Sequence, residues 1–202
     1  MMRPLTTERL ILRNWTEADR PLFRRINADE QVMAFFPFRR SAAEADALMD
    51  RLRRGIDARG YGLAAAVTRL GGEVVGFVGI QEANLEPAIP DGSVEIGWRL
   101  APEYWGRGYV TEAARAWLAF GFETLGLAEI VSFAVRDNHR STAVMQRLGM
   151  RADPSGDFDM PNIPEAYRAL RPHVLYRLDR HSWESRQDAA AAASGGGPIN
   201  PS

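Results

Sequence analysis

The spacing of apolar side chains changes along the first sixty residues, and each change marks a predicted element. Residues 5–15 place Leu10 and Leu12 on one side of an alternating segment, which predicts a first strand. Residues 16–28 open with a Thr-x-x-Asp capping arrangement and then carry apolar residues at helical spacing. Residues 41–60 begin with a Ser-x-x-Glu capping box and stop at a glycine. These patterns predict one strand followed by two helices.

After residue 60 the apolar spacing is typical of short strands. Residues 61–68 and 73–81 are rich in valine, alanine and glycine, and the Gly71-Gly72 pair between them predicts a hairpin turn. Residues 82–92 and 153–172 contain prolines and predict loops. The other predicted elements are strands at 94–100, 130–135 and 174–178, and helices at 111–125 and 140–148.

The order of these elements predicts the fold class. We expect an α/β (α+β) protein with a mixed, mostly antiparallel central sheet of about seven strands, flanked by about four helices. Residues 1–183 are predicted to form one domain. Residues 184–202 are rich in alanine, glycine, serine and proline, and are predicted to form a flexible tail.

Composition excludes several classes of chemistry. The 202 residues carry a formal charge of −1, which gives no attraction to nucleic acid or to an anionic membrane. The sequence contains no lysine, which excludes catalysis through a lysine Schiff base. The absence of cysteine excludes thiolate chemistry and is compatible with a reducing cytoplasm, which is the predicted location because no secretory signal is recognisable. The three histidines are scattered, so no metal site is expected. The sequence does not distinguish between a monomer and a homodimer.

A glycine turn, Trp105-Gly106-Arg107-Gly108-Tyr109, lies between a predicted strand and a predicted helix. Glycines let the backbone approach a ligand, and the free N–H groups of a helix's first turn bind anions. The segment lacks the lysine of a nucleoside triphosphate loop and the third glycine of a dinucleotide loop. Two interpretations remain open: a pyrophosphate site, or a tight turn in which the glycines serve packing.

This turn, followed by Thr111-Glu112-Ala113, resembles the acyl-CoA pyrophosphate loop of the GNAT superfamily of N-acetyltransferases, in the form found in its RimJ/RimL branch. Further blocks resemble that branch in the same order. They are Thr7-Glu8-Arg9-Leu10-Ile11-Leu12-Arg13, Glu95-Ile96-Gly97-Trp98, Asn138-His139-Arg140-Ser141 and Leu148-Gly149-Met150. The resemblance covers about residues 5–180 and implies the acyl-CoA N-acyltransferase fold, with acetyl-CoA as co-substrate.

The resemblance also implies roles for particular residues. The backbone N–H groups of the turn would bind the pyrophosphate, and the backbone of one strand would pair with the pantetheine arm. Asn138 would bond to the pantetheine, and Ser141 would lie near the thioester sulfur. The cofactor-binding residues are thus Trp98, Arg99, Leu100, Gly106, Arg107, Gly108, Tyr109, Val110, Thr111, Asn138 and Ser141.

The predicted catalytic residues are Glu95 and Ser141. Amide formation needs a base for the ammonium proton, and strand alternation can aim Glu95 at the thioester. The alternative is a surface carboxylate, or one that bonds to a neighbouring backbone amide. Many GNAT enzymes carry a tyrosine acid where Met145 stands, so Ser141 or water would protonate the thiolate; alternatively, Ser141 caps the helix after Asn138.

These residues predict transfer of an acetyl group to a primary amine, which is a protein or peptide N-terminus or a small molecule. Two alternatives stay open. One is a larger acyl group such as succinyl, which Arg99 or Arg140 would favour, and the other is an acyl-CoA-binding sensor without catalysis. On the acceptor side the candidates are residues 35–38, with three phenylalanines, and the loop acids Asp157 and Asp159.

Overall fold

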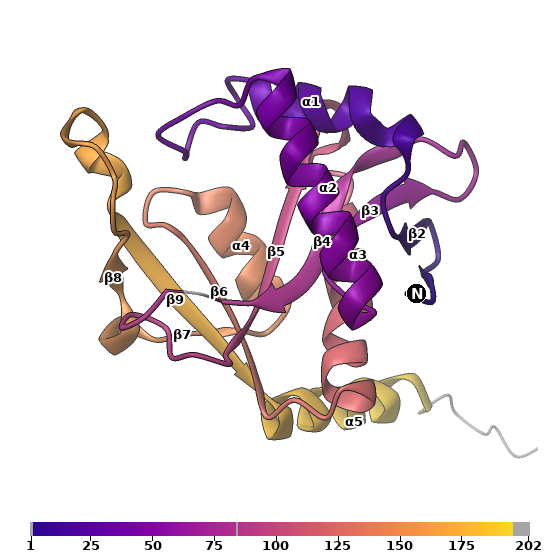
Figure 1. Cartoon of the computed structure of the whole chain (residues 1–202). Helices are drawn as coiled ribbons and strands as arrows, with labels where there is room; N and C mark the ends of the chain where they lie inside the picture. The colour runs from indigo at the N-terminus through magenta and orange to yellow at the C-terminus, as the bar shows by residue number, and fades with distance from the viewer. Residues whose placement is uncertain (1, 84, 196–202) are drawn as a thin grey trace, which may run out of the picture.

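The computed structural model of the chain describes residues 2–83 and 85–195 (Figure 1). One sheet runs through this part of the chain, in the order β1-β2-β3-β4-β5-β6-β9-β7, with β8 paired to β9. All pairs are antiparallel except β5 with β6. The strands are β1 (Leu5–Thr6), β2 (Leu10–Arg13), β3 (Leu63–Thr68), β4 (Val74–Glu82), β5 (Val94–Leu100), β6 (Glu129–Val135), β7 (Arg151–Ala152), β8 (Phe158–Asp159) and β9 (Pro172–Asp179).

Five α-helices accompany the sheet in the described residues. They are α1 (Arg20–Ala28), α2 (Ala42–Arg59), α3 (Tyr109–Ala119), α4 (His139–Arg147) and α5 (Arg180–Gly195). A π-helical turn, η3 (Phe120–Thr124), extends α3. Within the same residues no helix is long and apolar enough to cross a membrane. The mixed, mostly antiparallel sheet flanked by helices confirms the predicted fold class.

The local signals placed both ends of α2 correctly. The predicted capping box forms at the start of α2, where the Glu44 N–H donates to the Ser41 hydroxyl and the Glu44 carboxylate accepts from the Ser41 N–H. The helix stops at Gly60, which has a φ of +83°. These interactions span only three or four residues, which is why they can be recognised in a sequence.

The sheet separates two helical layers. On one face Phe77 of β4 packs with Phe23 of α1, their ring centroids 6.1 Å apart. On the other face Ile80 of β4 lies against Gly121, at the end of α3. Strand residues that are paired across the ladder share a face, so Glu95 and Arg99 of β5 point to the α1–α2 side. The two sides of β5 therefore face different helices.

Two segments differ from the predicted secondary structure. The predicted strand over residues 5–15 is a hairpin, because the Thr7 N–H donates to the Leu10 carbonyl and the Leu10 N–H donates to the Thr7 hydroxyl, which turns the chain. The segment from residue 184, which the sequence predicts to be a flexible tail, continues α5 as far as Gly195. Trp183 of α5 is 7 % exposed and stacks on Phe122. Flexibility beyond that helix stays a prediction, and residues 196–202 lie outside the described part.

Candidate active site

The glycine turn has the backbone conformation that the sequence predicted. Gly106 and Gly108 have φ values of +71° and +78°, a region in which side chains are strained. A Cβ placed on Gly106 would meet no atom within 4 Å, and one on Gly108 would meet only the end of Arg9, at 3.4 Å. Glycine is therefore needed here for conformation and not for internal packing, which disfavours the interpretation as a packing turn.

Six successive backbone N–H groups of this turn are available to a ligand. Helix α3 begins at Tyr109 and has no side-chain cap, and its first backbone hydrogen bond runs from the Glu112 N–H to the Gly108 carbonyl. Among the described residues, no hydrogen bond is recorded from the N–H groups of residues 106–111. Together with the positive end of the α3 dipole, they make a site for an anion such as a pyrophosphate.

A clamp of three side chains, Thr7, Arg9 and Glu112, holds this turn. The Arg9 Nε donates to Glu112 Oε2 at 2.6 Å, and the Arg9 backbone N–H donates to Glu112 Oε1 at 2.7 Å. The Thr7 hydroxyl donates to the same oxygen, and Arg9 Nη1 donates to the Arg107 carbonyl at 3.0 Å. Hydrogen bonds from Thr7 and from Arg9 lower the pKa of Glu112 although burial opposes them, so the carboxylate is ionised at neutral pH.

Strands β5 and β6 pair at one end and separate at the other. The parallel ladder is recorded only at Glu95 with Val131. The Ser132 hydroxyl donates to the Ile96 carbonyl at 2.9 Å, and beyond this point no pairing of β5 with β6 is recorded in the described residues. Residues 97–100 of β5 therefore present an open backbone edge.

The register decides which residues offer backbone groups at this edge. The Ala101 N–H donates to the Val75 carbonyl, in register with the rest of the β4–β5 ladder. Because such bonded pairs alternate, Arg99 turns its backbone to β4, whereas Trp98 and Leu100 turn theirs to the open edge. The register therefore favours Trp98 and Leu100 over Arg99 as the residues whose backbone can pair with a pantetheine, and a contact of Arg99 with the cofactor stays a prediction. The Leu100 carbonyl already accepts from Trp105 Nε1 at 2.9 Å, so its N–H is the group left at the edge.

Glu95 lies where the two strands begin to separate. Its Oε1 accepts from Gln81 Nε2 at 2.6 Å, and the side chain is half-buried. Burial raises the pKa of Glu95, and the hydrogen bond from Gln81 opposes this shift. Glu95 is thus neither a surface carboxylate nor one bonded to a backbone amide, and its raised pKa makes the carboxylate a stronger base than an ordinary glutamate.

Helix α4 brings the other predicted block to the same part of the fold. Asn138 is the N-cap of α4, and its Oδ1 accepts from the Ser141 N–H at 3.2 Å. Asn138 therefore caps the helix, not Ser141 as the alternative held. No hydrogen bond of the Ser141 hydroxyl is recorded in the described residues. The Arg140 guanidinium carbon lies 4.4 Å from the Trp105 ring centroid, which joins α4 to the glycine turn.

The other candidate residues differ in whether they are buried, bonded within the protein or exposed to solvent. Met145 is 1 % exposed and belongs to the core, so it supplies no polar group. Asp157 accepts from the Leu175 N–H and lies 3.7 Å from Arg136, so it is engaged within the protein, whereas Asp159 is exposed. Within the described residues no group of three or more histidine or carboxylate side chains could hold a metal ion.

The structure brings together the turn at 106–111, the edge at Trp98 and Leu100, and Glu95, all around β5 and the start of α3. Sequence reasoning missed Gln81 as the partner of Glu95, because nothing local marks a register partner fourteen positions away. Thr7, Arg9 and Glu112 belong to the motifs that the sequence shows, but the contact between them is not predicted by it.

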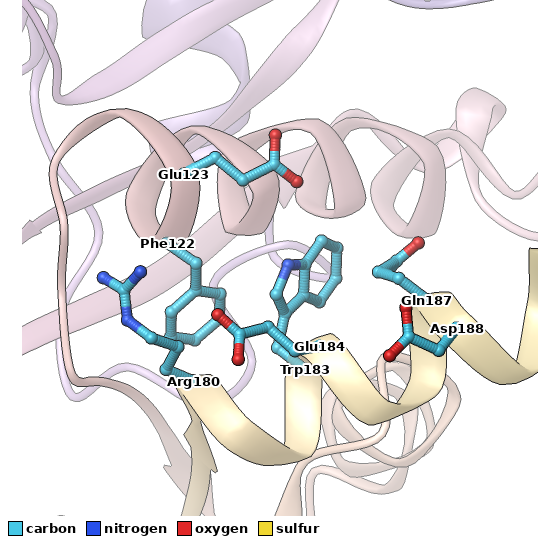
Figure 2. A pocket seen from close by; sticks show the side chains of 7 residues that line it. All are labelled: Phe122, Glu123, Arg180, Trp183, Glu184, Gln187 and Asp188. Atoms are coloured by element: carbon cyan, nitrogen blue, oxygen red, sulfur yellow. The ribbon is translucent and has the colours of Figure 1, made fainter.

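A separate surface hollow of about 150 Å³ lies between η3 and α5. Figure 2 shows Phe122 and Trp183 against each other there, with Arg180, Glu123 and Glu184 around them. None of the predicted site residues lines this hollow, so it stands apart from the glycine turn.

Comparison with known proteins gives consistent results. A family model described as an acetyltransferase (GNAT) domain matches residues 9–151. The chain is 26 % identical over 200 residues to the FsC-acetyl coenzyme A-N(2)-transacetylase of Aspergillus fumigatus, covering 94 % of this chain and 82 % of the relative.

Two solved structures are similar as well. An acetyltransferase from Agrobacterium tumefaciens is 29 % identical with a TM-score of 0.70, over 88 % of this chain and 95 % of the other. The ribosomal-protein-S5-alanine acetyltransferase of Vibrio fischeri has a TM-score of 0.69 over 90 % of this chain and 98 % of its own, and at 18 % identity it shows a shared fold.

Proposed function

The chain belongs to the acetyltransferase (GNAT) domain family, and from that premise we propose that it transfers the acetyl group of acetyl-CoA to a primary amine. We place it in the RimJ/RimL branch, and we take a protein or peptide N-terminus or a small-molecule amine as the acceptor. Ribosomal-protein acetyltransferases are among the proteins that share its fold, and the Aspergillus fumigatus relative is named as a transacetylase that uses acetyl-CoA. The cytoplasm is the compartment that the sequence predicts.

The observation that carries this proposal is the row of free N–H groups at residues 106–111, next to an open strand edge. The row is suited to a pyrophosphate, and the Trp98 N–H and carbonyl with the Leu100 N–H are suited to the amides of a pantetheine arm. Asn138 keeps its Nδ2 donor for the same arm, because only its Oδ1 is used in the cap. The arrangement thus offers hydrogen-bonding groups for the pyrophosphate and for the pantetheine arm of an acyl-CoA.

The reaction joins the amine nitrogen to the thioester carbon and breaks the carbon–sulfur bond. Glu95, at the point where β5 and β6 part, takes the proton that the amine loses, directly or through water. A backbone N–H of the open edge stabilises the negative charge that develops on the carbonyl oxygen. The thiolate receives a proton from the Ser141 hydroxyl or from water, since Met145 has none to give.

The test is release of free thiol from acetyl-CoA with a panel of N-terminal peptides, polyamines and amino sugars, next to a titration of acetyl-CoA binding. Release that depends on one class of amine is the expected result and names the acceptor. Binding without release from any amine would support the sensor alternative. Failure to bind acetyl-CoA would refute the assignment of the glycine turn.

A further inference from the structure

Two arginines and two phenylalanines form a cluster between β5 and the connection from α1 to α2. The Arg99 guanidinium carbon lies 4.4 Å from the Phe36 ring centroid, and that of Arg40 lies 4.6 Å from the Phe38 centroid. The two rings are 6.1 Å apart. Phe36 and Phe38 are 38 % and 44 % exposed, so solvent reaches the cluster.

Neither arginine has an acidic partner among the described residues. Arg99 Nη1 donates to Asn27 Oδ1 at 2.6 Å, and no ion pair is recorded for Arg99 or Arg40. The Arg40 Nε is buried and has no hydrogen-bond partner. The neighbouring Arg39, by contrast, pairs with Glu30 at 2.8 Å.

The charge of this cluster is poorly compensated by the protein. Burial, with the nearby charge of Arg40, lowers the pKa of Arg99 to about 10. Burial and the charge of Arg51 lower the pKa of Arg40, and the charge of Glu44, which forms no ion pair with Arg40, only partly opposes this shift. Both groups stay cationic at neutral pH, and a guanidinium offers five donors in a planar fork that matches a carboxylate. An anion would supply the missing partner.

The cluster is on the same side of the sheet as Glu95. Glu95, Gly97 and Arg99 alternate along one face of β5, and Gly97 places no side chain between the other two. Their four-residue separation corresponds to about 13 Å between the Cα atoms of Glu95 and Arg99. A molecule with an amine at Glu95 can therefore extend along Gly97 and reach the guanidinium of Arg99.

We propose that Arg40 and Arg99 bind a carboxylate carried by a substrate of the transfer reaction. This inference rests on the proposed function, because it assumes that Glu95 marks the reacting centre. The carboxylate can belong to the acceptor amine or to a dicarboxylic acyl group such as succinyl. The position on the α1–α2 side of β5, away from α3 and α4, favours the acceptor.

The first experiment compares thiol release with ω-amino acids of increasing chain length, up to ones that span from Glu95 to Arg99, and with their carboxamides, with rates expressed per neutral amine. For the wild-type chain we expect a KM about 10- to 100-fold lower for the carboxylate form, the range for a charge-assisted hydrogen bond. Arg40→Gln is expected to lose most of this difference and Arg40→Lys to keep part of it. Arg39→Gln is the matched control, an exposed arginine one residue away, and is expected to keep all of it.

The second experiment identifies the source of the carboxylate. With one neutral amine as acceptor, succinyl-CoA is compared with acetyl-CoA for the wild type and for Arg40→Gln. A preference for succinyl-CoA that disappears in Arg40→Gln assigns the carboxylate to the acyl group. Equal KM values for both members of every pair, or a preference that Arg40→Gln keeps, would overturn the proposal.

A third readout separates this inference from the proposed function. If no amine releases thiol from either acyl-CoA, the proposed transfer fails, and the cluster is tested by thermal unfolding with glutarate in chloride-free buffer. Stabilisation of the wild type and of Arg39→Gln, but not of Arg40→Gln, would support a carboxylate site. Equal response of all three chains would refute it.

Discussion

At the scale of single residues, Glu95 combines burial with a partner that leaves it able to bind and release a proton. Gln81 donates to one carboxylate oxygen and is neutral, so it positions the group without fixing it in the ionised form. An arginine in place of Gln81 would hold the pKa of Glu95 low and weaken it as a base. The pair therefore supports a role for Glu95 in proton transfer.

We predict that Glu95→Gln lowers turnover by about 10²- to 10⁴-fold, the usual contribution of a general base. Binding of acetyl-CoA should not change, because the turn at residues 106–111 does not contact Glu95 through any recorded bond. Steady-state kinetics with calorimetric titration of acetyl-CoA measure both. Unchanged turnover would remove Glu95 from the mechanism.

The raised pKa of Glu95 also predicts a pH dependence of stability. Below the ordinary glutamate pKa of about 4.3, the folded and unfolded chains both hold the proton and the residue costs nothing. As the pH rises towards the folded pKa, the unfolded chain loses the proton first, so the free energy of unfolding falls. Glu95→Gln cannot titrate, and its stability relative to wild type should increase through this window.

Urea midpoints at a series of pH values measure this effect. Glu103→Gln is a control of opposite sign, because a hydrogen bond from Arg25 lowers the pKa of Glu103 and its ionised form favours folding. If the midpoint difference between Glu95→Gln and wild type stays constant with pH, then Glu95 does not have a raised pKa.

At the scale of elements, the glycine turn is fixed by the N-terminal hairpin and not by its own residues alone. Glu112 stands on the first turn of α3 and binds the chain between β1 and β2 through Thr7 and Arg9. Arg9 also holds the Arg107 carbonyl and lies over the Tyr109 ring, with 4.9 Å to its centroid. The hairpin thus helps to hold the backbone conformation of the turn at residues 106–111, whose N–H groups are free.

We predict that Glu112→Gln weakens acetyl-CoA binding by about 10-fold or more, since a charge-assisted hydrogen bond contributes about 1.5–3 kcal/mol. Turnover at saturating acetyl-CoA should change little, because Glu112 is not a catalytic residue. Glu123→Gln, an exposed change on η3, is the control. A lower turnover at an unchanged dissociation constant would show that the clamp does not position the turn.

At the scale of the whole molecule, the two faces of the sheet carry different parts of the proposed site. Helices α3 and α4 contact each other. Arg99 points to the opposite side from Ile80 and α3, towards Phe36 in the connection from α1 to α2. An acyl donor and an acceptor can therefore approach the same point from opposite sides. This arrangement suits direct transfer between two bound substrates.

The last helix, α5, packs against η3 at the end of α3. Trp183 stacks on Phe122 at 5.7 Å between ring centroids and is almost fully buried. We predict that Trp183→Ala destabilises the chain by about 3–5 kcal/mol, or roughly 6–20 °C in Tm. Differential scanning calorimetry measures this loss, with Arg186→Ala on the same helix as a comparison. A shift of less than about 2 °C would indicate that α5 is not part of the cooperative fold.

Local residue patterns are enough to locate most of the elements. The capping box at Ser41, the glycine stop at Gly60 and the strand at 94–100 all depend on residues within a few positions of each other. The glycine turn belongs to the same class, because its positive φ values are a property of the two glycines. The helix in the C-terminal segment was not predicted, although its alanine-rich composition favours helix.

The groups that remain free for a substrate depend on contacts between segments far apart in the chain. The parting of β5 from β6 sets the open edge, and the β4–β5 register gives that edge to Trp98 and Leu100 while it turns the Arg99 backbone inward. The burial of Glu95 and the unpartnered state of Arg40 depend equally on segments far away in the chain. Such properties are sums over contacts between distant residues, and no local pattern encodes them.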